Sequence, residues 1–281
     1  MTFDLTRFYD DFPRVEAEFD AALDESLRPR GPEMLYDLVA EFGLAPGSRA
    51  VDVGCGEGEH TERLATRFGF DVLGVDPVPR HVELTGERAA SGTRERAASG
   101  TGERAASGIR VRAVLGSVER LPVGDGTTDL IWCRDVLVHV SDLDLAYAEF
   151  RRVLRPGGRA LIYQMYATDL LEPREAAAVF ATMGVVPASA DPRTTERAIA
   201  AAGLRVDACL ELGPEWGEFA AENGGDPGRK LLNAARLRRD PARYIARFGA
   251  EAYEIMLGDS RWHVYRMLGK LSPRVYLLTA P

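Results

Sequence analysis

The chain has few cysteines, no excess of basic charge and no long apolar run, and each shortage argues against a class of protein. Its three cysteines, Cys55, Cys133 and Cys209, lie in strand-like segments and indicate buried thiols rather than a disulfide framework. The net charge of −8 argues against a nucleic-acid partner, because phosphate recognition needs a basic face. No apolar run approaches the length of a membrane span, and residues 1–4 do not begin like a signal peptide. We therefore expect a cytoplasmic protein without a nucleic-acid or membrane partner.

Histidine is also scarce, with four residues in the chain. No pair of histidines or cysteines has the spacing of metal ligands, and no clear acidic cluster suggests a divalent-cation site. The sequence therefore predicts no metal.

Apolar segments of strand length alternate with helical segments through much of the chain. This alternation predicts an α/β fold, a Rossmann-like, doubly wound and mostly parallel sheet covered by helices on both faces. The expected strands are residues 48–53, 71–75, 110–115, 128–133, 157–165, 204–212 and 274–279.

The segments outside the central strands suggest three parts. Residues 1–46 read as an N-terminal helical cap, residues 47–165 as the core, and residues 166–281 as the rest of the sheet with a helical lid around 214–271. Within the core, residues 86–109 repeat an eight-residue unit close to GERAASGT. Glycine in every unit and the lack of large apolar residues predict a flexible insertion without a catalytic role, with a partner-binding loop as the alternative.

The most informative segment is VDVGCGEGEHT at residues 51–61, where an apolar strand runs into three alternating glycines and a helical pattern. Glycine lets the backbone turn tightly and brings its amides close to a ligand. Asp76 ends the next expected strand, 18 residues after Gly58. That is near the spacing at which an acid binds ribose hydroxyls in nucleotide-binding folds.

These residues resemble the class I S-adenosylmethionine-dependent methyltransferases of the small-molecule type. The similarity is carried by residues 51–58, by Asp76, and by three later segments: GSVERLP at 116–122, DLIWCRDVLVHV at 129–140 and RPGG at 155–158. It covers about residues 45–165. It implies a seven-stranded sheet with one reversed edge strand, and a cofactor, S-adenosylmethionine, across the carboxyl ends of strands one, two and four. The product would be S-adenosylhomocysteine.

The resemblance also implies which residues bind the cofactor. Two departures from the family pattern matter: Ser117 stands where an acid is usual, and Val138 stands where a glutamate is frequent. For Asp52, contact with the cofactor's ammonium through water and support of the glycine turn both remain open. The expected cofactor-binding residues are Asp52, Gly54, Cys55, Gly56, Asp76, Pro77, Ser117, Val118 and Arg134.

Three residues are candidates for acid–base chemistry, each with a structural alternative. Asp135 follows the fourth strand and is either a group that orients or deprotonates the acceptor or an acid favoured at a helix start. His139 is either a general base or a structural histidine. His263 is a second candidate base, from the lid.

Aromatic residues near the expected crevice are candidates for contacts with the acceptor, with core packing as the alternative. They are Tyr9, Phe12, Tyr163, Tyr166, Trp216 and Trp262.

The function predicted from these features is methyl transfer to oxygen or nitrogen, with carbon also open, on an enclosed small metabolite such as a secondary metabolite. A homodimer is a further expectation. One alternative is a nicotinamide-dependent oxidoreductase, which the acidic Glu57 and Glu59 disfavour because they would repel a pyrophosphate. The other is a protein that binds the cofactor without catalysis.

Overall fold

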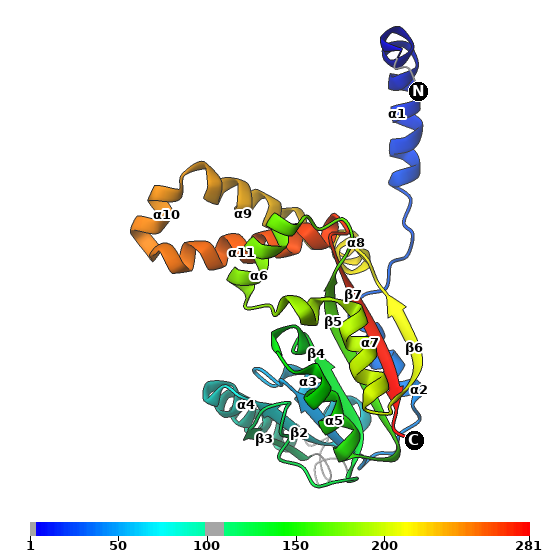
Figure 1. The fold of residues 1–281 in the computed structure, drawn as a ribbon, viewed down its shortest axis with the longest axis vertical. Helices are drawn as coiled ribbons and strands as arrows, with labels where there is room; N and C mark the ends of the chain where they lie inside the picture. The colour runs from blue at the N-terminus through cyan, green and yellow to red at the C-terminus, as the bar shows by residue number, and fades with distance from the viewer. Residues whose placement is uncertain (1–3, 99–109) are drawn as a thin grey trace.

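The protein is described by a computed structural model that covers residues 4–98 and 110–281. In these residues the chain forms one seven-stranded sheet in the order β3-β2-β1-β4-β5-β7-β6, with helices on both faces (Figure 1). The strands are β1 Arg49–Val53, β2 Asp71–Asp76, β3 Arg110–Leu115, β4 Thr128–Arg134, β5 Leu154–Ala167, β6 Arg205–Glu211 and β7 Leu271–Thr279.

Six strands run in one direction and β7 runs against both β5 and β6. The predicted class, a mostly parallel seven-stranded sheet with one reversed strand, is confirmed. The reversed strand lies one place inside the edge, and β6 is outermost. Burial explains this order, because Val275 and Leu278 of β7 are fully buried whereas Val206 of β6 is 45% exposed.

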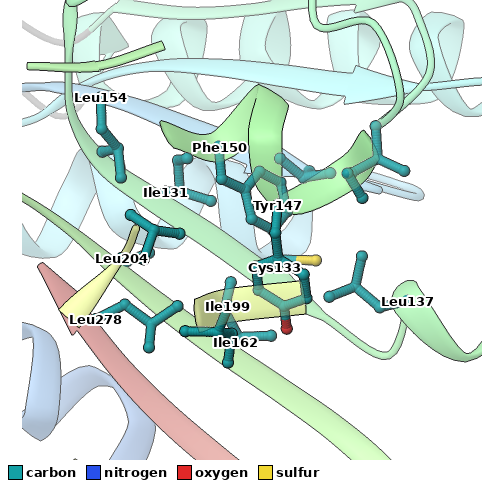
Figure 2. Close-up of a cluster of buried hydrophobic side chains, with 14 of the residues drawn as sticks. Ile131, Cys133, Leu137, Tyr147, Phe150, Leu154, Ile162, Ile199, Leu204 and Leu278 are labelled. Atoms are coloured by element: carbon teal, nitrogen blue, oxygen red, sulfur yellow. The ribbon is translucent and has the colours of Figure 1, made fainter. Parts of the chain in front are cut away.

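Helices cover both faces of the sheet, because successive side chains of a strand point to opposite faces and both sets are apolar here. In β4, Ile131 and Cys133 join the cluster around Tyr147 that Figure 2 shows, while Leu130 and Trp132 join a second cluster on the opposite face, around Leu64. The first helices are α1 Leu5–Leu23, α2 Met34–Glu41, α3 Glu59–Phe68, α4 Pro79–Ala98, α5 Leu143–Val153, α6 Pro173–Met183 and α7 Pro192–Ala201, with short 3₁₀ helices η1 Leu137–His139 and η2 Pro187–Ala190.

The structure adds detail to two expectations about the first half of the chain. Residues 86–98 of the repeat continue α4, because alanine, glutamate and arginine favour a helix and outweigh the glycines; residues 99–109 lie outside the described residues. The cap is split: α2 packs on the sheet through Leu35 and Val39, whereas α1 extends away from it (Figure 1). The prolines and glycine at residues 29–32 separate the two helices.

The helical segment between β6 and β7 forms a separate layer beside the carboxyl ends of the strands. It consists of α8 Glu215–Glu222, α9 Gly228–Arg239, α10 Pro241–Phe248 and α11 Ala250–Met267. Helices α9 to α11 form an arm, and α11 returns along α6 to the start of β7 (Figure 1). The arm therefore brings the end of α11 back to the sheet.

Candidate functional site

A cleft of about 550 Å³ opens at the carboxyl ends of β1, β2 and β4. Parallel strands present their carboxyl ends at one edge, so residues far apart in the chain meet there. The fold brings nine of the predicted site residues to this cleft, namely Gly54, Gly56, Asp76, Pro77, Ser117, Val118, Arg134, Asp135 and His139.

The turn after β1 depends on glycine at position 54. Gly54 has φ +72°, and a Cβ there would lie 2.1 Å from Cγ2 of Val136. Gly56 also has positive φ, but a Cβ at that position would meet no heavy atom within 4 Å and would face open space. Cys55 was expected in the site, but its thiol is buried and contacts Thr85 instead, so only its backbone belongs to the turn.

Asp76 holds the glycine turn and the start of the next helix. One carboxylate oxygen accepts a hydrogen bond from the Gly56 amide at 2.9 Å, and the other accepts from the Val78 amide at 2.9 Å. His81 Nδ1 lies 3.0 Å from the second oxygen, and His81 also lines the cleft. His81 was not predicted, although its place one turn into α4 after Asp76 was a signal for it. The oxygen that accepts from Gly56 has a second lone pair with which to accept from a ligand, whereas His81 engages that of the other oxygen.

Asp52 lies behind the turn and does not line the cleft. Its carboxylate is buried and accepts a hydrogen bond from the Thr61 hydroxyl at 2.6 Å. Burial raises the pKa of Asp52 to about 7, and the nearby Asp76 carboxylate adds to that increase. The hydrogen bond ties the end of β1 to α3, on either side of the glycine turn.

Arg134, at the end of β4, is fixed by residues from α2 and α3. Its Nη1 donates to Nε2 of His60 at 2.6 Å, and Nδ1 of His60 lies 2.5 Å from the Tyr36 hydroxyl. Burial, reinforced by the Arg134 charge, lowers the pKa of His60 to about 4, so at neutral pH His60 is an acceptor for Arg134. The guanidinium also lies 5.4 Å from the centre of the Trp216 ring. Sequence reasoning missed His60 and Tyr36.

Asp135 adopts a left-handed backbone with φ +58°, which is rare outside glycine and is often found at functional sites. Half of its side-chain surface is accessible, but the side chain faces the cleft rather than bulk water. Desolvation raises the pKa of Asp135, and four basic groups oppose the increase: Arg134, Arg266, His139 and His263. The two predicted histidines and Arg266 of α11 therefore all act on the charge of one carboxylate.

His139 ends the short helix η1 with one ring nitrogen engaged. Its Nδ1 lies 2.9 Å from the Gly184 carbonyl oxygen, so Nδ1 carries the hydrogen and donates it. The remaining nitrogen, Nε2, is then an acceptor and is suited to take a proton from a ligand.

A second cavity, of about 350 Å³, lies between α8, α9 and α11. Trp216, Lys230, His263 and Arg266 are among the residues that line it. Trp216 stacks on Tyr163 with ring centres 4.7 Å apart, and Arg266 donates to the Tyr163 hydroxyl at 3.5 Å. Since Arg134 also lies 5.7 Å from the Tyr163 ring centre, the Tyr163–Trp216 pair forms a wall between the cleft and this cavity.

Several aromatic residues predicted for the acceptor lie elsewhere. Tyr9 is 68% exposed on α1, which extends away from the sheet, and the Phe12 side chain lies outside the described part. Tyr166 is three residues after Tyr163 on β5 and therefore faces the opposite side, where it donates to Thr195. Trp262 packs against the buried cluster around Met165.

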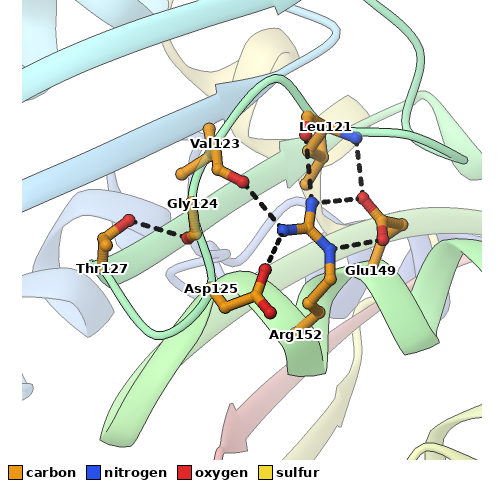
Figure 3. Close-up of polar contacts among 7 residues, drawn as sticks. All are labelled: Leu121, Val123, Gly124, Asp125, Thr127, Glu149 and Arg152. Atoms are coloured by element: carbon orange, nitrogen blue, oxygen red, sulfur yellow. Dashed lines mark hydrogen bonds and ion pairs between the residues drawn. The ribbon is translucent and has the colours of Figure 1, made fainter.

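The turn at residues 116–122 is held from behind by Arg152 of α5, which sequence reasoning also missed. Arg152 forms a two-pronged ion pair with Glu149 and donates to the carbonyl oxygens of Leu121 and Val123 (Figure 3). Glu149 in turn accepts from the Leu121 amide at 2.8 Å, and the Arg152 hydrogen bonds lower the pKa of Glu149. These contacts fix the chain that follows Ser117 and Val118 at the cleft wall.

Two features are absent from residues 4–98 and 110–281. No helix there has both the length and the apolar character needed to cross a bilayer. No group of three or more histidine, cysteine, aspartate or glutamate side chains there is arranged to hold a metal ion.

The core of the chain is similar to known methyltransferases. Residues 51–162 match the family described as "Methyltransferase domain". Methyltransferase GfsG of Streptomyces halstedii is 29% identical over 153 residues, which are 54% of this chain and 50% of that protein. The match thus spans about half the length of that curated relative.

Solved structures share the fold at low sequence identity. Phosphoethanolamine N-methyltransferase 2 of Haemonchus contortus, in complex with phosphomonomethylethanolamine and S-adenosylhomocysteine, is 18% identical with a TM-score of 0.65, over 91% of this chain and 54% of that one. The [4+2]-cyclase SpnF is 21% identical with a TM-score of 0.64, and the match covers 89% of this chain and 81% of that one. The second likeness means that this fold alone does not fix the reaction.

Proposed function

We propose that this chain, in which residues 51–162 form a class I S-adenosylmethionine-dependent methyltransferase domain, transfers the methyl group of that cofactor to a small metabolite. The observation that carries the proposal is the cleft in which the Gly54 turn, Asp76, Arg134 and Asp135 meet. The acceptor atom is oxygen or nitrogen, or else carbon. The aromatic wall beside the cleft suits an enclosed acceptor such as a secondary metabolite.

The residues of the cleft fit the chemistry of each part of the cofactor. Asp76, at the end of β2, has a free lone pair for one ribose hydroxyl on the oxygen that binds Gly56, and its other oxygen would accept the second hydroxyl in place of His81. Ser117 and Val118 line the wall for the adenine. Arg134, fixed by His60 and the aromatic wall, provides a cation for the methionyl carboxylate. The acidic side chains around the turn favour a ligand that carries a sulfonium cation.

The bound cofactor would supply an electrophilic methyl group, so the protein must mainly position the acceptor. Alignment of this kind is worth about 7–11 kcal/mol in well-oriented intramolecular reactions. Asp135 would orient the acceptor, and Nε2 of His139, the ring nitrogen that Gly184 leaves open, would take its proton. His263 of α11, whose Nδ1 lies 2.9 Å from the Asp259 carbonyl oxygen, is the second candidate base.

Calorimetry with S-adenosylhomocysteine and with NAD separates the proposal from the oxidoreductase alternative. We expect S-adenosylhomocysteine to bind and NAD not to bind, since Glu57 and Glu59 beside the turn repel a pyrophosphate. Binding of NAD in place of S-adenosylhomocysteine would overturn the proposal.

A turnover assay separates an enzyme from a protein that only binds the cofactor. The assay measures S-adenosylhomocysteine release from S-adenosylmethionine over a panel of phenols, amines, carboxylic acids and activated carbon acceptors. Release that depends on one acceptor class supports the enzyme and identifies the methylated atom. Binding without release for any acceptor favours the alternative.

We also propose that the protein works in the reducing cytoplasm, and as a homodimer. Cys55, Cys133 and Cys209 are all free thiols, and the first two are buried, which suits a reducing compartment. Cell fractionation tests the location. Light scattering tests the dimer, and the mass of a single chain at micromolar concentration would refute it.

A further inference from the structure

The cavity between α8, α9 and α11 is lined by more basic than acidic groups. Lys230, His263 and Arg266 line it, while Asp226 is the one acidic residue among its described lining residues. Asp226 is paired with Arg229 at 3.2 Å, and Lys230 is paired with Asp259 at 2.5 Å. Arg266 belongs to neither pair, and its charge acts on Asp135 from beyond ion-pair distance.

Arg266 is partly buried and lacks a carboxylate partner. Among the described residues none places a carboxylate oxygen within 4.0 Å of its guanidinium, and its hydrogen bond is to the neutral Tyr163 hydroxyl at 3.5 Å. Removing a charged group from water is costly unless a partner compensates it. A guanidinium presents a planar fork of donors that matches a carboxylate or a phosphate.

The wall beside Arg266 also has more hydrogen-bond donors than acceptors. Within the described structure, the buried Nε1 of Trp216 and the buried Nε of Arg134 both lack a hydrogen-bond partner. Both side chains belong to the stacked group that separates the cavity from the cleft. A surplus of donors favours a ligand rich in acceptor oxygens.

The cavity and the cleft approach each other at Tyr163, whose hydroxyl accepts from Arg266 of the cavity and whose carbonyl oxygen accepts from the Asp135 amide of the cleft at 3.1 Å. Arg266 and His263 line the cavity, yet both are close enough to Asp135 to act on its charge. The cavity is of a size that holds a small organic molecule. An acceptor seated in it would thus have a cationic anchor at one end and the candidate catalytic groups at the other.

We propose that this cavity receives the methyl acceptor, and that Arg266 anchors an anionic group of the acceptor, a carboxylate or a phosphate, while its nucleophilic atom faces Asp135. The inference rests on the proposed function and narrows the acceptor to anionic small molecules. Arg266 is thereby a specificity-determining residue.

The test compares three probes that share a benzyl group: benzyl phosphate, phenylacetate and the uncharged benzyl alcohol. Their dissociation constants are measured by NMR titration with the cofactor-free protein and with protein saturated with S-adenosylhomocysteine. We expect at least one anionic probe to bind the wild type about tenfold more tightly than benzyl alcohol, since a single cation distinguishes the two kinds of probe. The tighter anion tells a carboxylate site from a phosphate site.

Variants assign the preference to one side chain. Arg266→Gln should remove the preference for the anion and leave benzyl alcohol binding unchanged, whereas Arg266→Lys should keep part of it. Arg261→Gln is the matched control, because Arg261 lies on the same helix and is not among the described residues that line the cleft or the cavity. It should bind all three probes like the wild type.

Three outcomes would overturn the inference: equal affinity for charged and uncharged probes, a preference that survives Arg266→Gln, or no binding of either anion. Titration of S-adenosylhomocysteine into the same samples judges the proposed function separately. If that titration failed, the probe affinities of the cofactor-free protein would still decide the role of Arg266.

Discussion

Nη1 of Arg134 donates a hydrogen bond to Nε2 of His60 at 2.6 Å, across 74 positions of sequence. The contact fixes the direction of the guanidinium at the end of β4, where it lines the cleft. It requires neutral His60, and the lowered pKa of His60, about 4, provides that at physiological pH.

Replacement of His60 by alanine should weaken binding of S-adenosylhomocysteine about tenfold, or ~1.4 kcal/mol, because Arg134 loses the partner that directs it. Calorimetry measures the affinity. Arg134→Ala in the same assay gives the largest loss of affinity that a misdirected Arg134 could cause. An affinity equal to that of the wild type would show that Arg134 needs no support from His60.

Asp76→Ala should weaken S-adenosylhomocysteine binding at least ~100-fold while the protein still folds, since hydrogen bonds to a charged acceptor contribute about 1.5–3 kcal/mol each. Circular dichroism checks the fold, because Asp76 also accepts from the Gly56 and Val78 amides. Asp76→Asn keeps the shape of the side chain and should lose less affinity for S-adenosylhomocysteine than Asp76→Ala. Unchanged affinity in a folded alanine variant would exclude the ribose contact.

His139→Ala should lower the turnover number by about 10²–10⁴-fold, the range for general acid–base catalysis, with little change in cofactor affinity. The reason is that Nδ1 is occupied by the Gly184 carbonyl and Nε2 is left to accept a proton. Steady-state kinetics with the acceptor from the turnover panel gives the measurement. Normal turnover would make His139 structural and would direct the search for the base to Asp135 and His263.

Asp52→Asn should stabilise the protein at alkaline pH. The carboxyl has a pKa of about 7 when folded and an ordinary pKa of 3.8, so the folded state holds a proton that the unfolded chain releases as the pH rises through that window. The free energy of unfolding therefore falls across the window, and the penalty is complete above the folded pKa. The neutral asparagine avoids this penalty, which is on the order of 4 kcal/mol in mildly alkaline solution.

Urea unfolding of the Asp52 variant and the wild type at about pH 4, 6 and 8, which span the two pKa values, checks this expectation. The two curves should converge at the acid end and separate as the pH rises. Asp144→Asn, at an exposed position in the first turn of α5, is the control and should follow the wild type at every pH. A constant difference across the pH range would mean that Asp52 is ionised like an ordinary aspartate.

Alanine at Gly54 and at Gly56 should act in different ways. At Gly54 the new methyl group would overlap the Val136 side chain, so we expect a loss of at least ~2 kcal/mol in the free energy of unfolding. At Gly56 there is room, and the cost in stability should be about 1 kcal/mol, from positive φ alone. Because Gly56 lines the cleft, its methyl group should instead weaken S-adenosylhomocysteine binding. Thermal unfolding and calorimetry on both variants separate the two effects.

Local patterns in the sequence were sufficient to predict the sheet and the centre of the cleft. A strand followed by alternating glycines, and an acid at the end of the next strand, fix Gly54, Gly56 and Asp76 at one edge of a parallel sheet by topology alone. The same reasoning reached Arg134 and its neighbour Asp135, because they follow the strand that pairs with β1. Short-range rules of turn, period and strand direction need no side-chain coordinates.

Only the tertiary structure decided which side chains complete the site. His60 meets Arg134, and Arg266 meets Tyr163 across 103 positions, through helices whose placement depends on packing of whole faces. It also decided that α1 carries Tyr9 away from the sheet and that β6 lies outside β7. Such contacts join residues that no sequence period relates, so they follow from how the buried surfaces fit together and not from any local segment.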